Sequence, residues 1–293
     1  MKKRLLSILL CLCMVGTLLP YVSIPATAAE TVSYIDADGR EKTAQALPIT
    51  SESNILTSGW YYVSGEVTIT PTAATDHTSL VARGSVHLIL KDGCTLNINA
   101  GSSIYAGVEV PYGYWLSIYG QSEGENAGKL VASSTGRGAA FGSRYGYDGG
   151  TVNIYGGNII ATSTDFSAAI GAGNLGGISK INIAGGRVKA TSTGAAAIGG
   201  GGKSIGGAIS ITGGTVEATG LSAGIGGAGS EVTISGGTVT AISTDSGAGI
   251  GGGGGFAAAG GIKISGGTVI ARSASGAGIG SGSGSSNSAV HIT

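Results

Sequence analysis

The sequence is dominated by a repeated unit, and this repeat restricts the chain to a small number of folds. The clearest copy begins at Val232 and reads VTISGGTVTAISTDSGAGIGGG. Related copies occur on both sides of it, and equivalent positions of successive copies lie 23 to 36 residues apart. Periods of roughly 20 to 50 residues are typical of architectures in which each repeat packs on its neighbours. A stacked repeat structure is therefore the first expectation.

Three positions recur within each unit. The first is an apolar-x-apolar strand, which is followed by a second strand after a Gly-Gly pair and then by a small-apolar-glycine step. Alternate residues of a strand point to the same face, so each strand offers an apolar face to a common core. The first strands carry Leu116/Ile118, Val152/Ile154, Ile181/Ile183, Ile209/Ile211, Val232/Ile234, Ile262/Ile264 and Val290/Ile292. The second strands carry Leu130/Ala132, Ile159/Ala161, Val188/Ala190, Val216/Ala218, Val239/Ala241 and Val269/Ala271, and the third positions are Phe141, Ile170, Ile198, Ile225, Ile250 and Ile279.

We predict an all-β fold, a right-handed parallel β-helix (solenoid) of about seven to eight coils with three short strands per coil. It is expected to have an N-terminal cap and an open C-terminal end. The right-handed sense follows from the general preference of parallel crossover connections. No segment has the 3.6-residue period of an amphipathic helix. A β-sandwich or barrel of antiparallel hairpins is the alternative, but it would not require a register common to all copies.

Residues 1–28 are predicted to be a secretory signal peptide. Three basic residues precede an apolar segment from Leu5 to Leu19, and Ala26-Thr27-Ala28 is a small-x-small cleavage site. About fifteen apolar residues are short for a membrane span, although an uncleaved anchor is the alternative. The mature chain is therefore expected to be secreted or displayed at the cell surface, without membrane contact after cleavage.

The rest of the chain divides into three predicted parts. Residues 29–54 lack a clear period and indicate an extended N-terminal lead, and residues 55–115 indicate a cap around Trp60 and the first irregular coils. Residues 116–293 form the glycine-rich repeats. The last residues, Ala289 to Thr293, match only the opening of a unit, so we expect a chain truncated in mid-coil. Its open strand edge could pair with further domains or chains.

Charge and cysteine content exclude several classes of protein. Removal of Lys2, Lys3 and Arg4 leaves 13 basic against 16 acidic residues, a net charge of −3. This weak acidity argues against nucleic acid as a partner. Only Cys94 remains after cleavage, so no intramolecular disulfide is expected in spite of an oxidising destination.

Aromatic residues give the strongest indication of a binding site. Every Tyr and Trp falls at or before Tyr155. Because Leu116 and Ile118 are predicted to face inward, Trp115 and Tyr119 should face outward, with Tyr155 beside Tyr119 on the next coil. Exposed flat rings stack on sugar faces, so we predict glycan binding by Trp115, Tyr119, Tyr155, Tyr145 and Tyr147. The structural alternative is an aromatic ladder that covers the early coils or packs under the loop 119–129.

The chain resembles the glycine-rich repeat regions of secreted surface proteins of Gram-positive bacteria, which are adhesin-like or contain carbohydrate-binding domains. The resemblance rests on SGWYYVSGEVTIT from Ser58, SVHLILKDGCTLNI from Ser85, LSIYGQSEGENAGKLVA from Leu116 and the later ISGGTVTA and AGIGGG phrases. It implies an extracellular structural or adhesin-like β-solenoid, with cell-wall or extracellular polysaccharide as partner. The alternative is a dedicated carbohydrate-binding module of a larger polysaccharide-active protein.

The sequence does not favour an enzyme, a metal site or a cofactor. β-Helical lyases and hydrolases need clustered carboxylates, whereas Asp165 and Asp245 share a register but lie three coils, or about 14 Å, apart. His77, His87 and His291 have no metal-ligand spacing, and no catalytic residue is assigned. A hydroxyl ladder similar to that of ice-binding solenoids is interrupted where Gly220 and Ala274 stand; it comprises Thr162-Ser163-Thr164 and Thr191-Ser192-Thr193.

Overall fold

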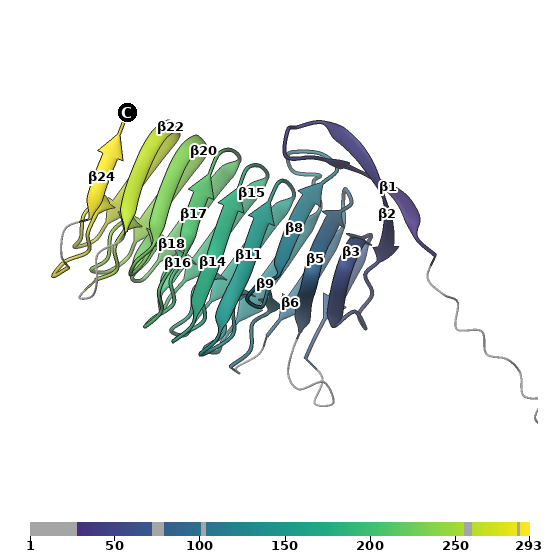
Figure 1. Cartoon of the computed structure of the whole chain (residues 1–293), viewed down its shortest axis with the longest axis horizontal. Helices are drawn as coiled ribbons and strands as arrows, with labels where there is room; N and C mark the ends of the chain where they lie inside the picture. The colour runs from purple at the N-terminus through teal and green to yellow at the C-terminus, as the bar shows by residue number, and fades with distance from the viewer. Residues whose placement is uncertain (1–27, 72–78, 101–103, 255–259, 286–287) are drawn as a thin grey trace, which may run out of the picture.

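The computed structural model describes residues 28–71, 79–100, 104–254, 260–285 and 288–293. Residues 1–27 of the predicted signal peptide, which spans residues 1–28, lie outside the described residues, as does His77. All regular secondary structure in the described part of the chain is β-strand. The strands wind into a parallel solenoid of about eight coils (Figure 1). The predicted all-β parallel β-helix is confirmed. Its right-handed sense stays a prediction.

One stack of parallel strands forms the long face that is turned to the viewer in Figure 1. In each coil, the strand of this stack pairs with its equivalent in the coils before and after. The stack consists of β3 (Ile55–Val63), β5 (Leu80–Leu90), β8 (Trp115–Gly120), β11 (Asp148–Ile154), β14 (Gly177–Ile183), β17 (Ala208–Ile211), β20 (Glu231–Ser243), β22 (Gly261–Ser273) and β24 (Ala289–Ile292).

Two further stacks complete the coils. The second stack consists of β4 (Glu66–Ile69), β6 (Thr95–Asn99), β9 (Lys129–Ser134), β12 (Asn158–Ser163), β15 (Arg187–Ser192) and β18 (Thr215–Gly220), and continues in the second halves of β20 and β22. The third stack consists of β7 (Val108–Glu109), β10 (Phe141–Gly142), β13 (Ile170–Gly171), β16 (Ala196–Gly199), β19 (Ala223–Gly226), β21 (Ile250–Gly251) and β23 (Ile279–Gly280). Each full coil therefore contributes three strand segments, as predicted.

The register between coils matches the repeat register that the sequence predicts. Ile118 pairs with Ile154, Ile154 with Ile183, and the column continues to Ile292. The second and third predicted columns are also in register, from Leu130 and from Phe141 onward. These inward side chains are almost all buried and form one continuous hydrophobic core. Like side chains therefore stack on like along the solenoid axis.

The Gly-Gly pairs make the tight corners between the first and second stacks. The second glycine of each pair has a positive φ, as at Gly186 (φ 73°) and Gly214 (φ 77°). An L-residue is disfavoured in this left-handed region, whereas glycine enters it freely. The corner backbones of neighbouring coils also lie against one another, so a Cβ at Gly214 would meet the carbonyl oxygen of Gly186 at 2.7 Å. The glycines of the repeat are thus required by both conformation and space.

Residues 29–54 are not simply an extended lead. They contain an antiparallel hairpin of β1 (Glu30–Ile35) and β2 (Glu41–Pro48), and the end of β2 pairs with β3 through Leu47 and Pro48. Figure 1 shows this hairpin arching over the outer face of the first coils. The Trp60 region, predicted as a cap, is strand β3 of the first coil.

The core includes the side chain of Cys94. Cys94 is a free, buried thiol, and burial raises its pKa to about 11. A group that ionises only at such a high pH is a poor nucleophile at neutral pH, so Cys94 acts as a small core side chain. No helix in the described part of the chain is long and apolar enough to cross a membrane.

Candidate functional site

The structure separates the five aromatic residues that were predicted to form one site. Trp115 and Tyr119 both point outward from β8, but they lie four residues apart along the strand, or about 13 Å. Trp115 is 43% exposed, whereas Tyr119 is only 8% exposed. Tyr155 does lie beside Tyr119, with ring centroids 5.1 Å apart. Tyr145 and Tyr147 lie in the loop before β11, near the start of the β8 and β11 strands and away from Tyr119 at the end of β8.

Tyr119 is the buried member of an aromatic stack whose other rings are half-buried: Tyr34, Trp60, His87 and Tyr155. The rings of Trp60 and His87 are parallel with centroids 4.3 Å apart, and Trp60 lies 5.3 Å from Tyr119. Tyr34 of the hairpin packs on both Trp60 and Tyr119 from above, at 4.7 and 4.9 Å. The prediction that Tyr119 is exposed is therefore wrong, because the hairpin of β1 and β2, which lies outside the repeats, covers it.

The hairpin is fastened to the stack by apolar and polar contacts. Val32 and Ala46 are buried against the aromatic rings. Lys91 forms an ion pair of 3.1 Å with Glu30, and the Gln121 side-chain amide donates to the backbone oxygen and hydroxyl of Ser33. Burial of apolar area dominates such docking, and the exposed ion pair contributes little. The aromatic stack thus attaches the hairpin to the solenoid.

Burial changes the titration of two polar groups in the stack. It raises the pKa of the Tyr119 phenol to about 12 and lowers that of His87. The Tyr119 hydroxyl and His87 Nδ1 lie 3.1 Å apart, in hydrogen-bond contact. Both groups are therefore expected to be uncharged at neutral pH. A neutral imidazole between aromatic rings fits the structural role better than a catalytic one.

A second group of aromatic side chains remains exposed, and we call it the aromatic corner: Tyr112, Tyr114, Trp115 and Tyr147. These side chains are 72%, 41%, 43% and 56% exposed, respectively. Backbone hydrogen bonds join their coils, from Tyr112 to Asp148 at 3.2 Å and from Thr151 to Tyr114 at 2.9 Å. Two adjacent coils thus present four solvent-accessible aromatic rings at one corner, including Trp115 and Tyr147 of the predicted set.

Tyr147 is positioned by a charged pair beneath it. The guanidinium of Arg144 lies 3.8 Å from the centroid of the Tyr147 ring, and Arg144 Nε is 3.5 Å from Glu109 Oε1. Glu109 is buried, and its burial raises the pKa of the carboxyl in spite of Arg144 and Arg83 nearby. A cation over a ring contributes about 0.5–2 kcal/mol according to its exposure. One face of Tyr147 is therefore occupied, and the ring is held in place from below.

Tyr145 is held in a similar way but is less accessible. It is half-buried, the guanidinium of Arg137 lies 5.4 Å from its ring centroid, and its backbone N–H donates to Ile104. The ring is already covered on one side by a cation. Of the five predicted residues, Trp115 and Tyr147 are consequently the ones available to a ligand.

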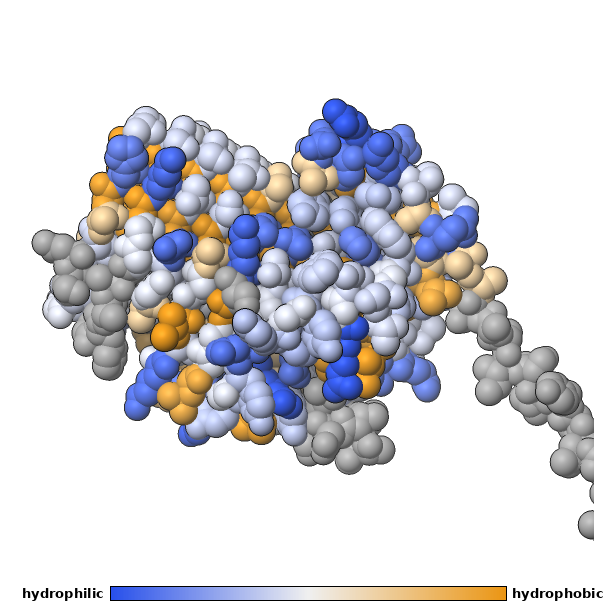
Figure 2. All heavy atoms as spheres, viewed as in Figure 1, coloured by the Kyte–Doolittle hydropathy of each residue, from blue (hydrophilic) through white to orange (hydrophobic). Residues whose placement is uncertain are grey.

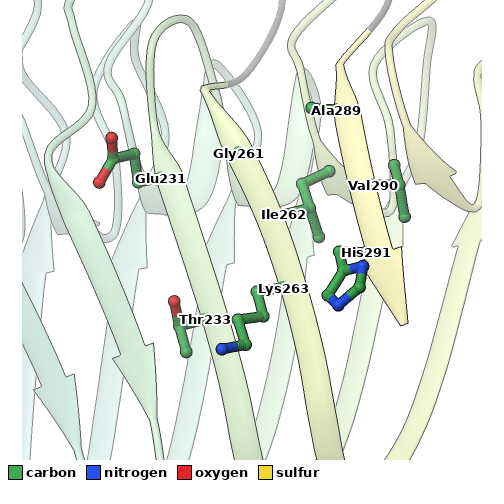
Figure 3. A pocket seen from close by; sticks show the side chains of 8 residues that line it. All are labelled: Glu231, Thr233, Gly261, Ile262, Lys263, Ala289, Val290 and His291. Carbon is green, nitrogen blue, oxygen red and sulfur yellow. The ribbon is translucent and has the colours of Figure 1, made fainter. Parts of the chain in front are cut away.

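Two hollows were not predicted from the sequence. The larger, of about 890 Å³, lies between the loop 121–128 and the outer side of β12 and β15. The smaller, of about 290 Å³, lies on the outer face of the last coils (Figure 3). It exists because Gly261 and Ala289 leave space between larger neighbours, and Figure 3 shows Lys263 and Thr233 below Glu231, with His291 on the next strand. An alignment of the outward-facing residues of successive coils could have revealed both hollows from the sequence.

The remaining outer face of the first stack carries mostly small side chains. Beyond the hairpin, small side chains such as Ala184, Thr212 and Ser235 continue the column of Tyr119 and Tyr155. Figure 2 shows hydrophobic atoms between pale and hydrophilic ones along this part of the solenoid. Within the described residues, no three His, Cys, Asp or Glu side chains are grouped so that they could hold a metal ion.

The fold and its register define a parallel β-helix repeat region. Comparison with protein families agrees: five segments match the family model described as Beta helix repeat, namely residues 152–174, 181–202, 209–230, 232–254 and 262–283. These segments begin in β11 and end beyond β23, so they cover the regular coils and, of the aromatic stack, only Tyr155. No curated protein and no solved structure matches the chain.

Proposed function

We propose that this protein is an extracellular β-solenoid of the cell surface that binds polysaccharide through its aromatic corner. The observation that carries the proposal is the exposure of Tyr112, Tyr114, Trp115 and Tyr147 on two adjacent coils. Exposed large aromatic side chains are costly to leave in water, and flat rings with polar edges match the apolar faces and hydroxyls of sugars. The regular coils beyond β11 then serve as scaffold.

The support of Tyr147 by Arg144 and Glu109 favours a binding surface over a chance exposure of rings. A ring that is already fixed loses less conformational entropy when a ligand stacks on its free face. Such preorganisation is typical of binding sites built on rigid elements. Binding without catalysis is proposed because Glu109, the carboxylate beneath Tyr147, is buried and paired with Arg144.

Affinity electrophoresis through gels that contain soluble polysaccharides tests the proposal. We expect one or more members of a broad panel of neutral and acidic polysaccharides to retard the purified mature chain. Trp115→Ala and Tyr147→Ala should each weaken retardation about two- to tenfold, since one stacked ring contributes about 0.5–1.5 kcal/mol beyond its area.

Phe166→Ala is the matched control. Phe166 is 55% exposed, close to the 56% of Tyr147, but it lies in the loop after β12 and outside the aromatic corner. This variant should retain the affinity of the parent chain. Unchanged mobility of the parent across the whole panel, or equal losses in Phe166→Ala and Trp115→Ala, would refute glycan binding at the corner.

A further inference from the structure

The loop between β8 and β9 is longer than its equivalents in the following coils. Eight residues separate Gly120 from Lys129, whereas three separate Ile154 from Asn158 and three separate Ile183 from Arg187. In repeat proteins, an insertion in one coil projects from one face and often belongs to a binding surface. This loop therefore stands out from the solenoid as a wall beside the coils that follow it.

The wall is held rigidly by its neighbours. Asp92 fixes its start, because the backbone N–H of Asp92 donates to the Gln121 side chain and the Ser122 hydroxyl donates to the Asp92 carboxylate, at 3.1 and 2.9 Å. The Asn158 side-chain amide donates to the carbonyl oxygens of Gly124 and Ala127, at 3.2 and 3.1 Å. The loop thus does not depend on a ligand for its shape.

Between this wall and the outer side of the second stack lies the hollow of about 890 Å³, which we call the loop groove. Glu123 and Glu125 line the wall, and both are exposed. The floor carries Lys129, Arg187 and Lys189, which the register between coils brings to one side. Negative charge therefore lies along one side of the groove and positive charge along the other.

These opposite charges do not pair across the groove. Glu123, Glu125, Lys129 and Lys189 take part in none of the ion pairs found among the described residues, while Arg187 binds Glu217 at 2.7 Å on the side of the floor away from the wall. Four charged groups that line the groove are thus available to a ligand. A ligand with both kinds of charge would satisfy them together.

We propose that the loop groove binds a short peptide segment that carries ammonium and carboxylate side chains. Its ammonium groups would bind Glu123 and Glu125, and its carboxylates would bind Lys129 and Lys189. Lys129 and Arg187 lie two coils apart, about 9.6 Å, which is the length of about three extended residues. The half-exposed Ile160 on the floor would contact an apolar part of the segment.

A peptide fits the loop groove better than a sugar chain does. No aromatic side chain lines the groove, so it lacks the stacking surface that the aromatic corner offers to glycans. A purely anionic polymer would meet the carboxylates of the wall. Side chains of both signs within three residues are ordinary in polypeptides, and charge complementarity of this kind selects partners and orients them.

Fluorescence anisotropy of a labelled hexapeptide of alternating Lys and Glu tests the proposal on the mature chain. We expect saturable binding at low salt that weakens at 0.5 M salt, because exposed charges are screened. Hexaglutamate and hexalysine of the same length should bind less tightly. Lys189→Gln and Glu125→Gln should each weaken binding of the mixed peptide up to about fivefold, the range of an exposed ion pair.

Two controls separate the loop groove from other surfaces. Lys263→Gln removes an exposed lysine of β22 outside the groove, and Trp115→Ala removes a ring of the aromatic corner; neither should change peptide binding. No binding of the mixed peptide would overturn the proposal. Tighter binding of hexaglutamate, strengthened by Glu125→Gln, would also overturn it and would identify a site for anions. Either result leaves glycan binding at the aromatic corner unaffected.

Discussion

Substitution of Gly214 by alanine is expected to destabilise the solenoid strongly. Gly214 is the second glycine of the corner between β17 and β18, with φ of 77°. An added Cβ would lie 2.7 Å from the carbonyl oxygen of Gly186 and 2.8 Å from the carbonyl group of Gly185. The Gly186 oxygen accepts a hydrogen bond from the Thr215 N–H at 2.9 Å, so it cannot move away without lengthening that bond.

The expected magnitude has two parts. The left-handed conformation costs an alanine about 1–2 kcal/mol relative to glycine. Forcing an extra carbon into a close-packed contact costs about 1–3 kcal/mol more. Gly214→Ala should therefore lower the free energy of unfolding by about 2–5 kcal/mol.

Two other glycines provide controls: one lacks only the close contact, and the other lacks both the close contact and the positive φ. Gly65 has φ of 63° but no heavy atom within 4 Å of an added Cβ, so Gly65→Ala should show only the conformational cost of about 1–2 kcal/mol. Gly261 has neither a positive φ nor a neighbour within 4 Å. Gly261→Ala should be neutral or stabilising by about 0.4–1 kcal/mol, since alanine reduces the freedom of the unfolded chain.

Equilibrium unfolding in urea, followed by far-ultraviolet circular dichroism, measures these differences. The comparison is valid where the free energy of unfolding depends on urea concentration with the same slope in all variants. The urea concentration at the midpoint of unfolding then reports stability. Gly214→Ala should be less stable than Gly65→Ala by about 1–3 kcal/mol, the cost of the overlap between coils. Equal stabilities of these two variants would refute the argument that close stacking requires the corner glycines.

Two further predictions concern titrating groups. Burial raises the pKa of Tyr119 to about 12, and the pKa values of Tyr34 and Tyr62 are also raised. A spectrophotometric titration of the chain without residues 1–28 should therefore show a phase above that of the exposed tyrosines, and Tyr119→Phe should remove one phenol from the highest part of this phase. A parent chain without a high phase would contradict the covered stack. For Glu109, burial raises the pKa of the folded carboxyl above 4.5, so its contribution to stability is present below pH 4.5 and is lost as pH rises through the folded pKa. Glu109→Gln should flatten this part of the stability curve in urea unfolding at several pH values, and an unchanged curve would exclude Glu109 as its cause.

The regular coils could be predicted because their information is local. An apolar residue on either side of one outward residue, as in Ile181 and Ile183, defines the inward face without knowledge of its partner. The spacing of successive copies then defines which residues share a column. The structure confirms these columns from Leu116 to Ile292.

The covered stack could not be predicted because it depends on contacts distant in sequence. Tyr34 meets Trp60 and Tyr119 only when β1 folds back over the solenoid, and nothing in the pattern of residues 29–54 specifies that docking. The parity argument correctly placed Tyr119 on the outer side but had no means to find its cover. In contrast, Lys129 and Arg187 each directly precede a core residue of the second strand. Alignment of the repeats could therefore have predicted that both lie on the same outer side of the second stack.

The hairpin also determines where along the solenoid another molecule can lie. A surface that repeats at every coil offers a partner several nearly equivalent positions, each displaced by about 4.8 Å from the last. This equivalence ends where β1 and β2 cover the outer sides of β3, β5 and β8. A long molecule that lies along the face from β24 would meet the hairpin at β8 and stop there. The hairpin thus breaks the translational symmetry of the repeat. It gives a bound molecule one defined end position along the solenoid.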